Sequence, residues 1–266
     1  MQGTKLLYMP HLEKLADSFF DVFYSKNWIG ECALLHDLSI NESYQVQDLV
    51  YSRRIELGEA FFGFKVGCTS RAIRAQLNIC EPIMGRLLTP HIHTENYLVR
   101  WRNYVNCAIE PEIVIVTGSD LFGLNLPDKV LIDAIEYVSP GVELHNYKFW
   151  CDPPCIQELI CSGGIHAGLI IGDSKVSPHN LSFRNEKFFV YKNGTLIASS
   201  SAGEIMGGPL NSLRWLVGNL AKRGESLKRG SIVIPGSPMP LIEINHNTDL
   251  RLVIDEIGSL VTKFIS

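Results

Sequence analysis

The sequence has little of what would mark a membrane or nucleic-acid-binding protein. No apolar run approaches the roughly 20 residues that span a bilayer. The N-terminal stretch of residues 1–10 lacks the long apolar core and small-residue cleavage site of a signal peptide. The formal net charge is −4, whereas a nucleic-acid surface needs a basic stripe. We therefore expect a cytoplasmic protein that binds neither a membrane nor nucleic acid.

Disulfide and zinc patterns are also lacking. The seven cysteines form an odd set without a Cys-x-x-Cys pair, which suits buried thiols in a reducing compartment better than a disulfide scaffold or a zinc site. Cys151 and Cys155 flank two prolines, a weak metal signal that we discount.

Several common catalytic motifs do not occur. The chain has no Gly-x-Ser-x-Gly elbow, no Gly-x-Gly-x-x-Gly fingerprint, no phosphate-binding loop ending in Gly-Lys-Ser/Thr and no His-Glu-x-x-His helix. His145 and His166 stand outside any such motif, and we interpret them as structural histidines.

What the sequence does contain indicates an α+β protein. Of the 266 residues, 46% are hydrophobic and 20% charged, as in ordinary globular proteins. Residues 1–60 read as mainly helical, with a second helix that starts at a Ser39-x-x-Glu42 capping box and stops at Gly58. Residues 61–266 read as short strands separated by turns, and we expect a single domain over residues 1–266 with this β-rich stretch as the catalytic body.

Further elements are expected within that body. Helices are predicted over residues 71–77, 128–138 and 209–223, the last with an apolar stripe that ends at Gly224. Asn193-Gly194 supplies the two positive-φ residues of a tight hairpin turn between two strands.

One predicted strand, residues 107–117, carries two carboxylates. Side chains alternate along a strand, so Glu110 and Glu112 point the same way, with Cα atoms about 6.6 Å apart at roughly 3.3 Å per residue. Two like charges at that separation repel by about 2.5 kcal/mol at an effective dielectric near 20. Either water at the rim of a sheet or a bound cation can compensate for this repulsion.

A third carboxylate and a lysine complete the candidate set. Glu143 begins a separate strand, and three carboxylates on two strands make an all-oxygen site that suits Mg²⁺ or Mn²⁺ rather than Zn²⁺. Lys65 lies among Phe61, Phe62, Phe64 and Val66. It is either a strand-end lysine with its stem on apolar surface or a partly buried amine that stabilises an enolate or moves a proton.

The order of these motifs along the chain resembles one family. Lys65-Val-Gly-x-Thr-Ser70 is followed by Pro82-x-x-Gly85, Glu110-x-Glu112, Pro140-x-x-Glu143, a Gly-Gly-Pro helix start at residue 207 and Leu227-Lys-x-Gly230. From about residue 46 onward, this pattern is similar to the 2-keto-4-pentenoate hydratase / 4-oxalocrotonate decarboxylase family of the fumarylacetoacetate hydrolase superfamily.

The resemblance implies a fold, a cofactor and a chemistry. It implies the fumarylacetoacetase C-terminal-like mixed β-roll, a homo-oligomer, and a lyase of aromatic meta-cleavage catabolism. The metal ligands would be Glu110, Glu112 and Glu143, the cofactor Mg²⁺ or Mn²⁺, and the catalytic lysine Lys65. The cation would hold the 1-carboxylate and 2-oxygen of a small 2-oxo or 2-hydroxydienoic acid, with Thr69, Ser70 and Ser237 as contacts to the substrate carboxylate.

The residues that would specify the reaction are mixed. Ile83 stands where hydratases of the family carry an aspartate that manages water, which favours the decarboxylase branch, whereas the Gly236-Ser237 ending looks like a hydratase. An acylpyruvate hydrolase usually needs a His-Glu dyad, which the sequence does not identify. A catalytically weak metal- or ligand-binding member is a further alternative.

Overall fold

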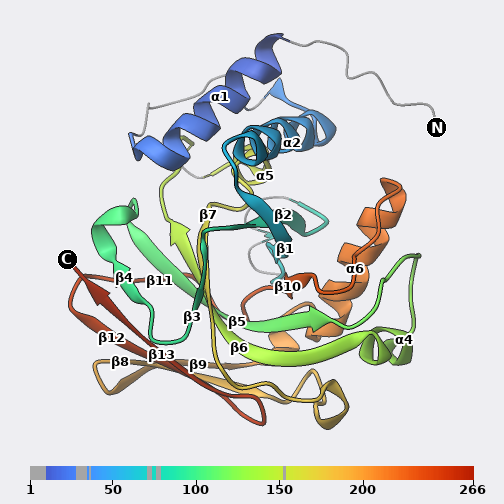
Figure 1. Ribbon diagram of the computed structural model, residues 1–266, viewed down its shortest axis with the longest axis vertical. Helices are drawn as coiled ribbons and strands as arrows, with labels where there is room; N and C mark the ends of the chain where they lie inside the picture. Colours follow the sequence, from blue (N-terminus) through green and yellow to red (C-terminus); the bar gives the residue numbers. More distant parts are fainter. Residues whose placement is uncertain (1–9, 28–34, 36, 71–73, 76–78, 152–153) are drawn as a thin grey trace.

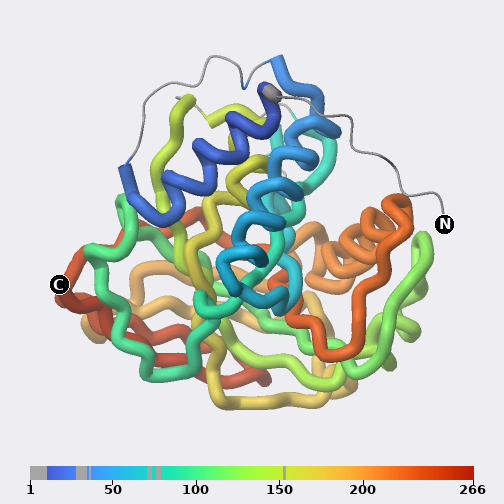
Figure 2. Tube along the Cα trace, turned by 45° about the horizontal axis from the view of Figure 1, so that its top comes forward, coloured from blue at the N-terminus to red at the C-terminus, as the bar shows by residue number. Residues whose placement is uncertain are grey.

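The structure, a computed structural model, describes residues 10–27, 35, 37–70, 74–75, 79–151 and 154–266. The helix expected over residues 71–77 lies largely outside the described residues. Two helices, α1 (Pro10–Ser25) and α2 (Ile40–Glu56), come before the first strand, and with α5 (Ile156–Cys161) they lie together on one side of the molecule (Figures 1 and 2).

The start of α2 follows from its capping box. The Ser39 hydroxyl accepts the Glu42 backbone N–H at 3.2 Å, and the Glu42 carboxylate accepts the Ser39 backbone N–H at 2.8 Å. This confirms the helix start predicted from the sequence. The apolar stripe of α1 packs against α2 and the segment before α5, through Leu12, Leu15, Ala16, Phe19, Val22, Val46 and Trp150.

The body is built from two sheets of unequal size (Figure 1). The eight-stranded sheet has the order β2-β1-β10-β5-β6-β7-β3, and β11 pairs with β5. Its strands are β1 (Ala60–Gly67), β2 (Ile83–Thr89), β3 (Ile92–Thr94), β5 (Cys107–Thr117), β6 (Ile135–Asn146), β7 (His166–Ile171), β10 (Ile232–Ile234) and β11 (Ile242–Glu243). The pairs β1–β10 and β3–β7 are parallel and the others antiparallel, so the sheet is mixed.

The five-stranded sheet has the order β4-β13-β12-β8-β9. Its strands are β4 (Leu98–Arg100), β8 (Lys187–Lys192), β9 (Thr195–Ser201), β12 (Thr248–Ile254) and β13 (Gly258–Ile265). Asn193 and Gly194, with φ of 51° and 80°, form the turn between β8 and β9, as the sequence predicts.

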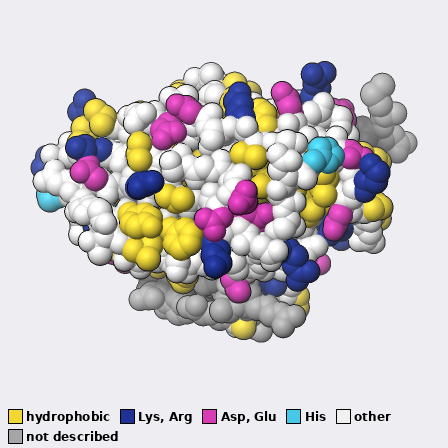
Figure 3. Space-filling view, turned by 90° about the horizontal axis from the view of Figure 1, so that it is seen from below, with side chains coloured by type: hydrophobic (Ala, Val, Ile, Leu, Met, Phe, Trp, Pro, Cys, Tyr) yellow, Lys and Arg dark blue, Asp and Glu magenta, His cyan; other side chains and the backbone are white. Residues whose placement is uncertain are grey.

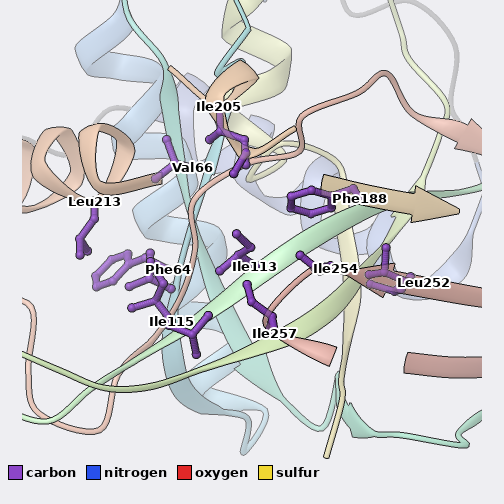
Figure 4. Packing of buried hydrophobic residues seen from close by; sticks show 14 of the residues in the cluster. Phe64, Val66, Ile113, Ile115, Phe188, Ile205, Leu213, Leu252, Ile254 and Ile257 are labelled. Atoms are coloured by element: carbon purple, nitrogen blue, oxygen red, sulfur yellow. The ribbon is translucent and has the colours of Figure 1, made fainter. Parts of the chain in front are cut away.

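The main core lies between the two sheets. Figure 4 shows Phe64 and Ile113 of the larger sheet in one cluster with Phe188, Leu252 and Ile254 of the smaller one. Helix α6 (Pro209–Lys222), predicted over residues 209–223, adds its buried stripe to this cluster through Leu210, Leu213, Leu216, Val217 and Leu220.

The helix predicted over residues 128–138 is too long. Helix α4 (Asp128–Asp133) is only six residues long, and the chain then enters β6 at Ile135. Ile135, Tyr137 and Val138 pair with the end of β5. Pairing with a buried neighbour strand therefore overrides the local helical pattern at these residues.

No helix among the described residues is long and apolar enough to cross a membrane. The face shown in Figure 3 carries acidic and basic side chains interspersed with hydrophobic ones.

Candidate metal and catalytic site

The three glutamates meet on one face of the larger sheet. In the β5–β6 pair, Glu110 lies directly opposite Glu143, and Glu112 lies opposite Gly141. The residues of β5 on either side of this glutamate pair, Ile109 and Ile113, face the core between the sheets. The glutamates therefore point to the face away from the five-stranded sheet. Glu112 and Glu143 are fully buried, whereas the Glu110 side chain is 20% exposed.

Lys65 lies on the same face, two strands away from β5. Its Nζ is 2.8 Å from Glu143 Oε1 and donates to the Gly164 carbonyl at 3.2 Å. Burial by itself would lower the pKa of Lys65, but the charges of Glu143 and Glu110 outweigh it and raise that pKa above the ordinary value. The structure thus makes Lys65 a buried ammonium group.

Glycines bring a turn close to this lysine. A Cβ on Gly164, whose φ is +74°, would lie 2.8 Å from Lys65 Nζ, and a Cβ on Gly85 would lie 2.6 Å from the Gly163 carbonyl oxygen. A side chain at Gly85 would collide with the turn, and one at Gly164 would displace the Lys65 amine, so glycine at both positions lets the turn lie this close to β1 and β2.

Two histidines that sequence analysis missed touch the same carboxylates. His145 Nε2 lies 3.1 Å from Glu110 Oε2 and 3.4 Å from Glu143 Oε2. His166 Nδ1 lies 2.7 Å from Glu143 Oε1. Both rings are buried. The sequence led us to interpret both as structural histidines, and the structure places both rings against the candidate carboxylates.

The two histidines differ in the direction in which their surroundings shift the pKa. Burial works to lower both pKa values, but the Glu143 charge and the hydrogen bond to Glu110 raise the pKa of His145 to about 9. For His166, burial prevails over Glu143 and lowers the pKa to about 4. A neutral His166 whose Nδ1–H donates to Glu143 leaves Nε2 as an acceptor, and Nε2 has no hydrogen-bond partner among the described residues.

A signal for His145 was present in the sequence. Glu143 and His145 are two residues apart on one strand, so they share a face by the same alternation that pairs Glu110 with Glu112. His166 had no comparable signal, because its position depends on how β7 pairs with β6, where the register shifts between Leu144 and His145.

The remaining carboxylate, Glu112, is held by a backbone group. Its Oε2 accepts the Gly236 N–H at 3.0 Å. Burial and the neighbouring charges of Glu143 and Glu110 raise the pKa of Glu112 well above its ordinary value. For Glu143, Lys65 and His145 outweigh burial and hold the pKa well below the ordinary value.

These residues fit a divalent cation. Glu112 Oε1 and Glu143 Oε2 are buried and accept no hydrogen bond from any described residue, and buried carboxylate oxygens normally have a donor or a metal. One ligand atom each from Glu110, Glu143 and His145 lies within 4.8 Å of the others. Glu112 follows Glu110 by two residues on the same face but is not one of those three.

Two of the expected substrate contacts, Thr69 and Ser237, lie beside the backbone that holds Glu112. Thr69 is buried against Gly236, where a Cβ would lie 2.4 Å from Thr69 Oγ1, so Thr69 adjoins the backbone that holds Glu112. Ser237 follows Gly236 and is buried, and its hydroxyl accepts the Met239 N–H at 3.3 Å. Ser70 is half-buried next to Thr69.

Ile83 lies on the lysine side of the site. It is 2% exposed and packs with Leu159, Ile160 and Ile165. Its Cδ1 would be 3.6 Å from a Cβ on Gly164, the residue whose carbonyl holds Lys65. Ile83 therefore gives this side of the site an apolar wall.

A second group of metal-ligating residue types lies elsewhere. Cys151 Sγ is 3.7 Å from Cys155 Sγ, near Glu158. The Glu158 carboxylate already accepts the backbone N–H groups of Trp150 and Cys151. The structure thus brings the cysteine pair together with a carboxylate that also orders the backbone at residues 150–151.

Comparison with solved structures defines the fold class. The chain superposes on 4-oxalocrotonate decarboxylase from Pseudomonas putida, complexed with magnesium and adipate, with a TM-score of 0.91 at 24% identity over 98% of this chain and 100% of that one. It is also similar to fumarylpyruvate hydrolase from Pseudomonas aeruginosa, complexed with Mn²⁺ and pyruvate, with a TM-score of 0.62 at 14% identity over 77% and 89% of the two chains. The predicted α+β fumarylacetoacetase-like β-roll is confirmed.

Sequence comparison reaches the same group. No family model matches the chain. It is 23% identical over 230 residues to 2-keto-4-pentenoate hydratase from Paraburkholderia xenovorans, covering 86% of each protein. It is 26% identical over 223 residues to 4-oxalocrotonate decarboxylase from a Pseudomonas species, covering 84% of this chain and 86% of that protein. The resemblance indicated by the sequence motifs is thus confirmed, and it includes both hydratases and decarboxylases.

Proposed function

We propose that the protein is a divalent-cation-dependent lyase that acts on small 2-oxo or 2-hydroxydienoic acids. The observation that carries this proposal is the buried carboxylate of Glu143, which directs one oxygen to Lys65 and the other toward Glu110 and His145. We further propose that Glu110, Glu112 and Glu143 hold the cation, Mg²⁺ or Mn²⁺. The hydratases and decarboxylases similar to this chain support the reaction class.

The chemistry follows from charge and burial. A divalent cation, when bound, stabilises the negative charge that develops on the substrate 2-oxygen. Lys65 keeps its proton because of Glu143 and Glu110, so it can donate a hydrogen bond to an anionic oxygen or deliver a proton to carbon. Thr69, Ser70 and Ser237 are proposed to orient the substrate carboxylate.

Within this class, Ile83 favours decarboxylation over hydration. A hydratase has to position water against an alkene carbon, and isoleucine offers no hydrogen bond for that water. An apolar surrounding instead destabilises a carboxylate relative to neutral CO₂. Ile83 in its cluster with Leu159, Ile160 and Ile165 provides such a surrounding.

An acylpyruvate hydrolase is the second candidate, and the His166–Glu143 contact favours it. The 2.7 Å contact orients a neutral imidazole with Nε2 free to accept a proton from water. The ring also lines a small pocket, partly open to solvent, together with Phe19, Arg54 and Asn146. A third candidate function is ligand binding at the same cation site with little catalytic turnover.

The test is a spectrophotometric assay of three substrates: 2-hydroxypenta-2,4-dienoate, 4-oxalocrotonate and an acylpyruvate. Each is assayed with Mg²⁺, with Mn²⁺ and with EDTA, using wild type and Glu112→Gln. Turnover of either of the first two that is abolished by EDTA supports the lyase, and turnover of the acylpyruvate alone selects the hydrolase. Binding of the cation without turnover of any of the three substrates would support the ligand-binding function instead.

Three further proposals accompany this function. The protein is proposed to form a homo-oligomer and to serve aromatic catabolism, as the resemblance implies, and to work in the cytoplasm, as its cysteine usage indicates. Light scattering of the purified chain at several concentrations tests the first, and a monomer throughout would contradict it.

A further inference from the structure

Gln47 of α2 holds two backbone carbonyls of other elements with one amide group. Its Nε2 donates to the Met84 carbonyl of β2 at 3.0 Å and to the Ile160 carbonyl of α5 at 2.6 Å. The side chain is buried, and its Oε1 has no hydrogen-bond partner among the described residues. The two donated bonds therefore orient the amide. Gln47 thus links β2 to the end of α5, where α2 passes beside both (Figure 1).

Both carbonyls belong to segments that meet beside the lysine of the site. Met84 is followed by Gly85, where a Cβ would lie 2.6 Å from the Gly163 carbonyl oxygen. The Ile160 carbonyl also accepts the Gly163 N–H at 3.0 Å. The two carbonyls that Gln47 holds are thus on the two sides of this close approach, one on the strand and one at the base of the turn. Its amide therefore limits how far the turn can move away from β2.

The same turn supplies a hydrogen-bond acceptor for Lys65. The Gly164 carbonyl accepts a hydrogen bond from Nζ at 3.2 Å, and Glu143 holds Nζ at 2.8 Å. An ammonium group has three hydrogens. With two of them directed at Gly164 and Glu143, the direction of the third is fixed, and the third is the one that can reach a substrate oxygen. The position of the turn therefore decides where Lys65 can donate.

We propose that Gln47 is a positioning residue for Lys65: its amide holds the Met84 and Ile160 carbonyls together and so keeps the turn at residues 163–164 against the lysine. This inference rests on the role of Lys65 in the proposed function, and it assigns control of that role to a residue of the helical N-terminal part. Without the amide, two carbonyls lose a donor and the turn can relax away from β2. A small displacement of a catalytic group lowers the rate of the chemical step more than it weakens substrate binding.

Tyr44 provides a matched control on the same helix. Its hydroxyl accepts the Met84 N–H at 3.2 Å, so it binds the same residue of β2, but this hydrogen bond does not involve α5. Gln47→Met keeps the length of the side chain and removes both donors, whereas Tyr44→Phe removes only the hydroxyl. A general loosening of β2 from α2 would appear in both variants, whereas release of the turn would appear only in Gln47→Met.

The experiment makes two measurements on the full-length protein. Hydrogen exchange followed by NMR compares the Gly163 amide with amides of β5, and relative to these it is expected to exchange at least about 10-fold faster in Gln47→Met than in wild type or Tyr44→Phe. Steady-state kinetics uses Mg²⁺ and the lyase substrate that wild type turns over. We expect kcat to fall about 10-fold in Gln47→Met with KM changed by less than about 3-fold, and Tyr44→Phe to stay close to wild type in both.

Three results would overturn the inference. Equal Gly163 exchange in Gln47→Met and wild type means that the amide does not hold the turn. Faster exchange with unchanged kcat means that the turn does not position Lys65, and an equal fall of kcat in Gln47→Met and Tyr44→Phe means that β2 as a whole has loosened.

Failure of the proposed function gives a different result. Wild type that turns over no substrate, while Gly163 exchange still responds to Gln47→Met, contradicts the proposed function and with it the role for Lys65, but leaves the link between α2 and the turn intact. Should Gln47→Met fail to fold, Gln47→Glu takes its place, because a buried neutral carboxyl offers one donor to two carbonyls. Wild-type exchange and kcat in that variant would overturn the inference.

Discussion

Lys65 and Glu143 form an ion pair that is almost completely removed from water, with Nζ 2.8 Å from Oε1 and side-chain exposures of 3% and 0%. The two residues lie on β1 and β6, which are separated in the sheet by β10 and β5. The pair therefore ties together strands that share no backbone hydrogen bonds. Removing one member leaves a buried charge without its partner, which is far more destabilising than removing both.

The first prediction tests this pair by a double-mutant cycle in EDTA. Lys65→Met should lower the free energy of unfolding by about 3–5 kcal/mol, since it removes the ammonium partner of the buried Glu143 carboxylate. Adding Glu143→Gln to Lys65→Met should recover part of that loss. Urea unfolding of the wild type, both single variants and the double variant measures the coupling. Additive losses would mean that the two side chains do not interact.

The second prediction concerns the turn that approaches Lys65. Gly163 and Gly164 have similar positive φ values, +65° and +74°, so alanine at either should cost about 1–2 kcal/mol of stability. Only at Gly164 would the new Cβ meet Lys65 Nζ; at Gly163 it meets nothing within 4 Å. Gly164→Ala should therefore reduce kcat at least 10-fold, roughly 1.4 kcal/mol, while Gly163→Ala stays close to wild type. Equal kcat values in the two variants would argue against a positioned lysine.

The third prediction addresses the choice of reaction at Ile83. Ile83→Asp introduces a group that can orient water, and Ile83→Asn has the same shape without the charge. Both should be destabilised, because Ile83 is buried in an apolar cluster. Only Ile83→Asp should raise hydration of the dienoate relative to decarboxylation of 4-oxalocrotonate. The ratio of the two kcat/KM values is the measurement, and efficient hydration by wild type with no gain in Ile83→Asp would refute the argument.

The fourth prediction concerns how the helices attach to the sheet. The Glu59 carboxylate, between α2 and β1, accepts hydrogen bonds from Tyr24 of α1 and Arg54 of α2 and contacts His91. Burial by itself would raise the pKa of Glu59, but the hydrogen bonds from His91 and Tyr24 and the charge of Arg54 hold it below its ordinary value of 4.5.

A depressed carboxyl pKa contributes stability above the unfolded value, and that stability is lost as pH falls through the folded value. Wild type should therefore exceed Glu59→Gln by about 2 kcal/mol at pH 7. The difference should fade as pH drops below 4.5. Chemical unfolding of both proteins across this range measures it; a difference that does not change with pH would exclude the carboxylate charge as its cause.

Much of the local structure could be predicted from the sequence because its causes are local. The capping box at Ser39 and Glu42, the Asn193-Gly194 turn and the apolar stripe of α6 each act within a few residues, and each occurs where predicted. The prediction of a helix over residues 128–138 is wrong from Ile135 onward. There the chain pairs with the end of β5, more than fifteen residues away in the sequence, and this pairing decides its conformation.

In the candidate site, too, some features have local causes and others depend on contacts between distant residues. In any strand, residues two apart point to the same face, so the sequence by itself determined that Glu110 and Glu112 share a face. It also determined that two like charges at this spacing need a compensating group. Which groups compensate for the two carboxylate charges depends on the register of paired strands and on which distant segments of the chain pack against them. Pairing of β5 with β6 set Glu110 against Glu143 and brought His145 beside both, and the glycine turn at residues 163–164 lies against Lys65. Only the tertiary structure could decide this, because those contacts join residues separated by 35 and 99 positions in the chain.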